Sequence, residues 1–143
     1  MMNYTISKVH ALIKNGNLTA EILVSKYLER IDKIDKSGPK INSIIEINPD
    51  AIIIAKELDA YYEKNGMKGP LHGIPILIKD NIDTDDKMKT TAGSITIEEY
   101  GGDCKKDASI VVKLRKAGAI ILGKTNLSEM ANFRGKRSMS GWS

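Results

Sequence analysis

Residues 69–81 read Gly-Pro-Leu-His-Gly-Ile-Pro-Ile-Leu-Ile-Lys-Asp-Asn, and this stretch decides the fold. A short apolar run bounded by glycine and proline is typical of a buried strand. Strand alternation puts Ile74, Ile76 and Ile78 on one face, and Pro75, Leu77 and Lys79 on the other. Lys79 then ends the strand, where parallel α/β sheets carry their chemistry. Partial desolvation at such a position lowers the pKa of an amine and makes it a usable base, although most lysines after strands are solvated loop residues.

The composition is that of an ordinary soluble globular domain. The chain has 143 residues, which is enough for one domain with a real core, and 41% of them are hydrophobic against 28% charged. Aromatic residues make up only 5%, so the core is expected to be aliphatic. No apolar run approaches the roughly 18 residues that span a bilayer, and the first eight residues contain no apolar segment of a secretory signal. The sequence therefore predicts no membrane partner.

The residues that could bind a metal or a cofactor are few. Cys104 is the single cysteine, which excludes an intrachain disulfide and favours a reducing compartment, the cytoplasm. Its place in a Gly-Gly-Asp-Cys-Lys-Lys loop indicates an inert thiol. His10 and His72 cannot make a zinc site with one cysteine, and no carboxylate spacing completes one. We expect no metal and no cofactor.

The charge balance is weakly basic, with a net charge of +4 and a pI of about 9.1. Such a balance permits weak attraction to nucleic acid. The charges of both signs are mixed along each predicted helix, however, and no aromatic residues are interleaved with the short basic clusters. A solvated surface is the better account, and no nucleic-acid partner is expected.

Capping and turn residues predict an α/β sheet with at least one parallel pair of strands. Thr5, Thr19, Asp107 and Asn126 are predicted N-caps, and Pro49 is predicted to be the first residue of a helix. Helices are predicted over 6–14, 20–36, 49–64, 108–117 and 127–133, and strands over 41–47, 74–78 and 119–122. The small polar run at 90–94 is either a pocket lining or a plain turn.

Two motif matches are rejected on context. Residues 118–125 satisfy the P-loop pattern, but an amphipathic helix precedes the first glycine, and Ala-Ile-Ile-Leu between the glycines favours a buried strand. The N–H groups of a strand are engaged in its ladder and cannot also bind phosphate. Residues 83–86 invite a calcium interpretation, but the glycine and the glutamate that complete such a loop are missing.

The ordered blocks Gly-Pro-Leu-His-Gly-Ile-Pro-Ile-Leu-Ile-Lys-Asp-Asn-Ile, Thr-Thr-Ala-Gly-Ser and Lys-Ala-Gly-Ala-Ile-Ile-Leu-Gly-Lys-Thr-Asn-Leu-Ser-Glu resemble the amidase signature family. The resemblance is close over residues 69–143, and the tail at 129–134 and 140–143 is most similar to peptide amidases and general amidases. It implies the N-terminal part of a mixed-sheet α/β fold, with helices packed on a partly parallel sheet. Residues 1–66 are then an N-terminal helical region, and residues 67–143 begin the α/β core.

The resemblance also implies a chemistry and a substrate class. The family hydrolyses amide C–N bonds with a serine nucleophile, a bridging serine held by a cis peptide, and a lysine, which falls at Lys79. The substrate would be a small amide or a peptide amide. Both serines belong to segments beyond residue 143, and Ser138, Ser140 and Ser143 are not at their positions. We therefore expect an N-terminal fragment that is inactive alone, with uncovered sheet edges that favour self-association.

Two other functions remain open. The first is a fragment of an amidotransferase A subunit that acts on charged tRNA, against which the Asn-Phe-Arg and Ser-Gly-Trp-Ser tail argues. The second is a non-catalytic binding or remnant module, which no sequence feature specifically supports. Activity of the purified chain on any amide would count against the second alternative.

Overall fold

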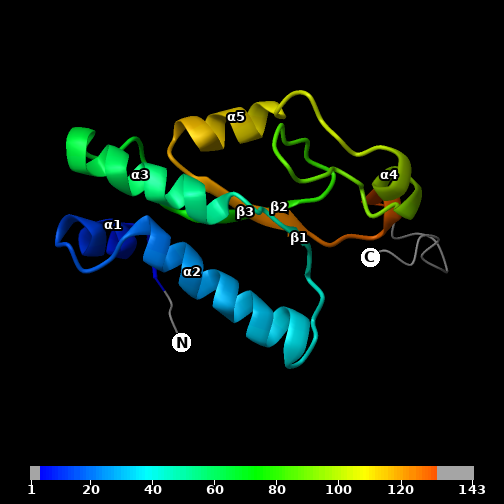
Figure 1. Cartoon of the computed structure of the whole chain (residues 1–143), viewed down its shortest axis with the longest axis horizontal. Coiled ribbons are helices and arrows are strands. Elements are labelled where there is room, and N and C mark those ends of the chain that lie inside the picture. Colours follow the sequence, from blue (N-terminus) through cyan, green and yellow to red (C-terminus); the bar gives the residue numbers. More distant parts are fainter. Residues whose placement is uncertain (1–3, 132–143) are drawn as a thin grey trace.

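A computed structural model describes residues 4–131 of the chain and shows a three-stranded mixed sheet with helices on both faces (Figure 1). The helices are α1 (Ile6–Lys14), α2 (Ala20–Arg30), the π-helix η1 (Ile31–Ser37), α3 (Ala51–Asn65), α4 (Ile95–Tyr100), α5 (Ser109–Lys116) and the 3₁₀ turn η2 (Glu129–Ala131). The strands are β1 (Ile44–Ile47), β2 (Pro75–Lys79) and β3 (Ile120–Thr125). Their order is β1-β3-β2, with β3 antiparallel to β1 and parallel to β2. The predicted α/β class with a parallel strand pair is confirmed.

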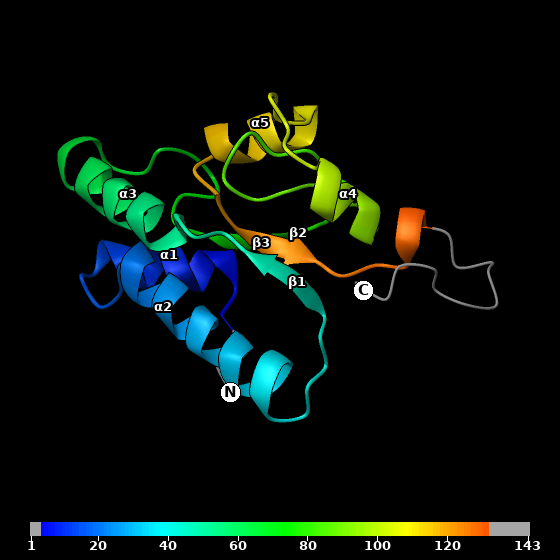
Figure 2. The ribbon, with the colours of Figure 1, turned by 45° about the vertical axis from the view of Figure 1, so that its right-hand side comes forward.

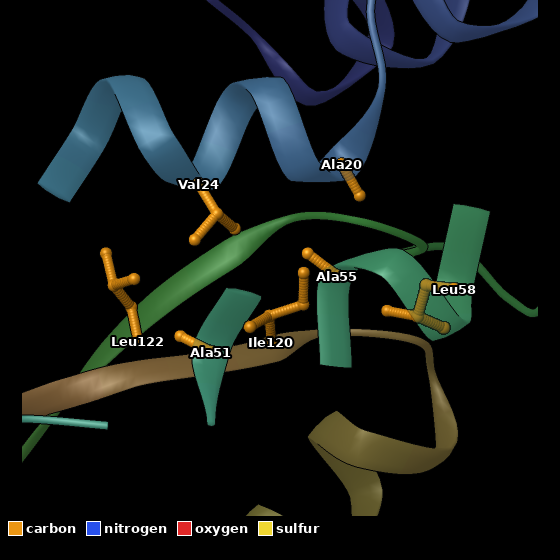
Figure 3. Close-up of a cluster of buried hydrophobic side chains, with 7 residues drawn as sticks. All are labelled: Ala20, Val24, Ala51, Ala55, Leu58, Ile120 and Leu122. Atoms are coloured by element: carbon orange, nitrogen blue, oxygen red, sulfur yellow. The ribbon is translucent and has the colours of Figure 1, made fainter. Parts of the chain in front are cut away.

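Helices lie on opposite faces of the sheet (Figure 2), and a hydrophobic cluster on each face holds them there. On one face, α2 and α3 meet the inward side chains of β3, and the small residues of these helices bring them close together (Figure 3). This cluster consists of Ala20, Val24, Ala51, Ala55, Leu58, Ile120 and Leu122. On the other face, Val111 of α5 and Met88 of the loop after β2 pack with Ile78 of β2 and Ile121 of β3. The core is aliphatic, as the composition predicts.

The first two helices begin where the sequence predicts. Thr5 accepts a hydrogen bond from the Lys8 N–H at 3.2 Å, and Thr19 accepts one from the Ile22 N–H at 3.1 Å. Asp59 of α3 adds a second cap to α2, because its carboxylate accepts the N–H groups of Ala20 at 2.7 Å and Glu21 at 3.0 Å. The side chain of one helix thus satisfies the exposed donors at the start of the other.

Three predicted helix starts are wrong, those at Pro49, Asp107 and Asn126, and no α-helix follows Asn126 within the described residues. Pro49 lies outside α3, which begins at Ala51, since Asn48 turns the chain by accepting the Asp50 N–H at 2.9 Å. Asp107 does not cap α5: its carboxylate accepts the Asp85 N–H at 2.8 Å and bonds to Arg115.

The predicted helix over 20–36 is continuous but changes its winding. It becomes the π-helix η1 after Arg30, and Asp35 in η1 is buried. The Asp35 carboxylate accepts the N–H groups of Ser43 at 2.7 Å and Ile44 at 3.3 Å, so it fixes the start of β1 to the end of the helix.

The helix α4 has no counterpart among the helices predicted from the sequence, and the helix predicted over 127–133 is wrong. Of these residues, 129–131 form only the 3₁₀ turn η2, with Met130 at φ 54°, and residues 132 and 133 lie outside the described part.

Two glycine turns join the starts of β2 and β3. The N–H groups of Leu71 and Gly73 donate to the carbonyls of Ala117 and Gly118, and the Ile120 N–H donates to the Ile74 carbonyl at 2.9 Å. Gly118 has φ +89°, and a Cβ there would lie 2.8 Å from the Cα of His72. Only glycine allows the two backbones to approach this closely.

Among the helices within residues 4–131, none combines the length and the apolar character that a bilayer crossing needs.

Candidate functional site

Lys79 is the last residue of β2 and pairs with Thr125 of β3, as the sequence predicts for the end of this strand. Its carbonyl accepts the Ile82 N–H at 3.0 Å, which closes a turn directly after the strand. Strand alternation puts its side chain on the same face as Leu77, and both side chains are exposed. Lys79 is therefore held by its backbone, but its side chain is exposed, so residues 4–131 do not provide the partial desolvation that the sequence predicts.

Asp80 follows Lys79 and is fully buried. Its N–H donates to the Thr125 carbonyl at 3.1 Å, and its own carbonyl accepts the Ala92 N–H at 2.9 Å. Its carboxylate accepts hydrogen bonds from the N–H and the hydroxyl of Thr91. Asp80 thus connects the end of β2 both to β3 and to loop 90–94.

Lys124 of β3 is also fully buried, with 0% of its surface exposed. Its ammonium donates to the Ile82 carbonyl at 2.9 Å and to the Thr90 hydroxyl at 2.8 Å, and it lies 3.8 Å from an Asp80 carboxylate oxygen. Burial lowers the pKa of Lys124, and the negative charge of Asp80 opposes that effect. Sequence reasoning considered this lysine only as a P-loop residue and missed its contact with Asp80.

An extra residue in β3 aims Lys124 at this network. Ile76 pairs with Ile121 and Leu77 pairs with Gly123, so Leu122 has no partner of its own in β2. Such a bulge reverses the alternation that follows it. Lys124 consequently pairs with Ile78 and faces the 82–90 segment, not the α2 side where Leu122 lies.

Residues 118–125 therefore include the buried strand β3, which the sequence analysis predicted when it rejected a P-loop here. The Lys124 ammonium is bonded to Ile82 and Thr90 inside the protein.

Loop 90–94 lies beside these residues and has a constrained backbone. Ala92 has φ 50°, a left-handed conformation that is uncommon for any residue but glycine. The Met130 N–H donates to the Ala92 carbonyl at 2.7 Å. Thr91 and Glu46 line a cavity of about 210 Å³, together with Ile45, Lys87, Lys89, Glu98 and Asp103. Burial raises the pKa of Glu46, although its carboxylate accepts the Lys89 N–H.

The remaining candidate residues have structural partners. Arg115 bonds Asp86 at 2.6 Å and Asp107 at 2.9 Å, so the acidic segment at 83–86 is held by a guanidinium. Cys104 lies in a loop and contacts an Asp83 oxygen at 3.3 Å. Within residues 4–131, no group of three or more His, Cys, Asp or Glu side chains is arranged to hold a metal ion. Ser138, Ser140 and Ser143 lie outside the described residues.

His10 and His72 lie near each other without forming a metal site. The His72 ring is buried, its Nδ1 accepts the Lys68 N–H at 3.2 Å, and its carbonyl oxygen lies 3.1 Å from Nε2 of His10.

Comparisons with known proteins agree with one another. The family model described as Amidase matches residues 23–141. A protein of Arabidopsis thaliana named as a probable amidase is 44% identical over 141 residues, which are 97% of this chain and 27% of that protein. The A subunit of the glutamyl-tRNA(Gln) amidotransferase of Thermoanaerobacter pseudethanolicus is 41% identical over 132 residues, which are 92% of this chain and 26% of that protein.

Among solved structures, the native peptide amidase from Stenotrophomonas maltophilia superposes with a TM-score of 0.87 at 45% identity, over 99% of this chain and 28% of that enzyme. The chain thus spans about a quarter of the length of the relatives that it matches.

Proposed function

Because the chain belongs to the amidase signature family, we propose that it provides the lysine of an amide-hydrolysing site, with Lys79 as the proton acceptor. The observation that carries the proposal is the position of Lys79 at the carboxyl end of β2, with a backbone fixed by pairing with Thr125 and by the turn that the Ile82 N–H closes. A neutral amine at this position can take up the proton that a serine hydroxyl must lose before it attacks a carbonyl carbon.

The reaction that we propose is hydrolysis of a C–N bond in a small amide or a peptide amide. The serine oxygen adds to the amide carbon, the amine leaves with a proton, and water then releases the acid from the serine ester. We expect both serines outside residues 1–143, so the groups that would pass the proton to Lys79, and later return it to the leaving amine, are not among these residues. The peptide amidase among the structural relatives supports a peptide amide as substrate.

A second candidate is the A subunit of an amidotransferase, which the relative of Thermoanaerobacter pseudethanolicus supports. In that case the same lysine would serve the formation of an amide on charged tRNA. A chain that supports hydrolysis of a free peptide amide without tRNA would favour the first candidate. The remaining alternative, a non-catalytic binding or remnant module, would show neither activity. A cytoplasmic location is part of the proposal and rests on the lone cysteine.

The test uses a chimera in which this chain replaces the matching part of the Stenotrophomonas maltophilia peptide amidase. We expect the chimera to hydrolyse a peptide amide. Lys79→Ala in the chimera should lower kcat/KM by roughly 10²–10⁴-fold, the usual contribution of a positioned acid or base. The matched control is Lys113→Ala, which changes an exposed lysine of α5 and should leave turnover unchanged.

We expect the 143-residue chain alone to release no ammonia from the same substrate. Turnover by the chain alone would contradict the need for residues beyond it. Parent-level turnover by the Lys79→Ala chimera would remove Lys79 from the mechanism.

A further inference from the structure

We propose that Lys124 and Asp80 are positioning residues: their buried pair fixes the turn after β2 and loop 90–94, and thereby the place of Lys79. In this role neither Lys124 nor Asp80 contacts the substrate. The inference rests on the proposed function for the catalytic task of Lys79, but the geometric part of it can be tested separately.

The path from Lys124 to Lys79 has two steps. The Lys124 ammonium donates to the Ile82 carbonyl at 2.9 Å, and the N–H of the same Ile82 donates to the Lys79 carbonyl at 3.0 Å. Both the N–H and the carbonyl of Ile82 are therefore hydrogen-bonded. The Thr90 hydroxyl also donates to the Ile82 carbonyl at 3.4 Å, so without the ammonium the turn that closes after Lys79 keeps only this longer bond on its far side.

The path through Asp80 leads to the loop. Its carbonyl accepts the Ala92 N–H at 2.9 Å, and its carboxylate is bonded by Thr91. Ala92 has φ 50°, and a residue in this conformation persists only when its surroundings hold it there. Lys124 reaches the same loop from the other side, through the Thr90 hydroxyl at 2.8 Å. The pair thus determines where the loop lies relative to the end of β2.

Stability alone does not explain the pair. Moving two charges out of water is costly, and apolar residues of similar volume often stabilise a protein as well or better. What apolar side chains cannot provide is a set of hydrogen bonds to the Ile82 carbonyl and to Thr90 and Thr91. The bulge at Leu122 is needed to aim Lys124 there, and Gly123 permits it, since a Cβ at Gly123 would lie 2.5 Å from the Glu46 carbonyl oxygen.

The first experiment measures amide hydrogen exchange in the full 143-residue chain. Lys124→Met should accelerate exchange at the Ile82 and Ala92 amides by roughly 100-fold relative to amides inside α2, because a buried pair has lost one partner. Thr90→Val removes one acceptor of the ammonium and should accelerate the same amides by roughly tenfold. The matched control is Lys56→Met, which breaks an exposed ion pair with Glu21 and should not affect these amides.

The second experiment measures turnover of a peptide amide by the chimera described above. Thr90→Val and Lys124→Met should lower kcat with little change in KM, by up to about 100-fold, the effect of a misplacement of about 1 Å. The double variant Asp80→Asn/Lys124→Met removes both charges and should recover the unfolding free energy lost in Lys124→Met. It should not recover kcat, because the bonds from the ammonium to Ile82 and Thr90 are still missing.

A purely structural role predicts that kcat returns together with stability in the double variant, and that result would overturn the proposal. Unchanged exchange at Ile82 and Ala92 in both Lys124→Met and Thr90→Val would overturn it as well. If the parent chimera does not hydrolyse a peptide amide, the proposed function fails, whereas the exchange experiment still decides whether the pair holds the turn.

Discussion

Lys79 and Lys124 lie on neighbouring strands, but their surroundings differ completely. Lys79 is exposed at a strand end, whereas Lys124 is bonded to Ile82 and Thr90 and shielded from water. An exposed amine can exchange a proton with a group that approaches it, but a buried ammonium whose donors are satisfied mainly fixes its neighbours. This difference supports separate roles for the two lysines in one site.

His72 is the residue for which we predict a pH effect on stability. Burial lowers the pKa of His72, the nearby Asp59 raises it, and His10 and Lys68 lower it further. The unfolded chain, with a histidine pKa of about 6.5, then binds more protons than the folded chain. The free energy of unfolding should therefore fall as the pH falls below about 6.5, and it should stop falling below the folded pKa.

Denaturant titrations between neutral and acidic pH measure this slope. His72→Asn keeps an acceptor for the Lys68 N–H and should flatten the slope, because the residue can no longer be protonated. His10→Gln serves as the comparison, since it removes the other histidine and keeps a donor for the His72 carbonyl. An equal slope in His72→Asn and the parent chain would contradict the assignment.

At the level of single residues, the sequence predicted the place of Lys79 but not the network behind it. The apolar run and its bounding glycines were enough to end a strand at Lys79. The burial of Lys124 depends on the bulge at Leu122, and no sequence pattern shows which residue of a strand is left unpaired. With regular alternation, Lys124 would face α2 and α3 together with Ile120 and Leu122.

Among the elements, the contact between α2 and α3 depends on Asp59. Asp59→Ala removes two charge-assisted hydrogen bonds to the start of α2 and should lower the free energy of unfolding by about 1–3 kcal/mol. Thermal or denaturant unfolding measures the loss. The control is Glu63→Ala, which changes an exposed carboxylate on the same helix and should cost little. Equal stability of the two variants would show that Thr19 alone caps α2.

At the level of helices and strands, a sequence predicts best the features that depend on local contacts. Thr5 and Thr19 were predicted correctly because each hydroxyl bonds to an N–H in the first turn of its own helix. Asp107 was predicted wrongly because its carboxylate is occupied by Arg115 of α5 itself and by the Asp85 N–H, which is 22 residues away in sequence. The winding change in η1 likewise depends on Asp35 binding Ser43 and Ile44, which is a contact between elements.

For the whole molecule, we expect the outer edges of β1 and β2 to promote self-association of the chain. Neither strand has a second neighbour within residues 4–131, and Leu77 on β2 is 37% exposed. Unpaired edges with apolar neighbours promote association. We predict that the 143-residue chain forms larger species as its concentration rises, measured by sedimentation velocity.

Leu77→Lys should reduce this association, because a charge next to an edge opposes pairing. The control is Val112→Lys, which puts the same charge on the exposed side of α5, where Val112 is 50% exposed. A parent chain that stays monomeric at every concentration, or a Val112→Lys variant that suppresses association equally, would contradict the prediction.

The place of β3 at the centre of the sheet also sets the order of events on the ribosome. β1 and β2 are synthesised first, yet each pairs only with β3 within residues 4–131, and Ile120–Thr125 are translated last of the three strands. No strand ladder of this sheet can therefore exist in the nascent chain until β3 has left the exit tunnel. The contact between α2 and α3 is available earlier, since Asp59 is the last residue that their shared cap requires.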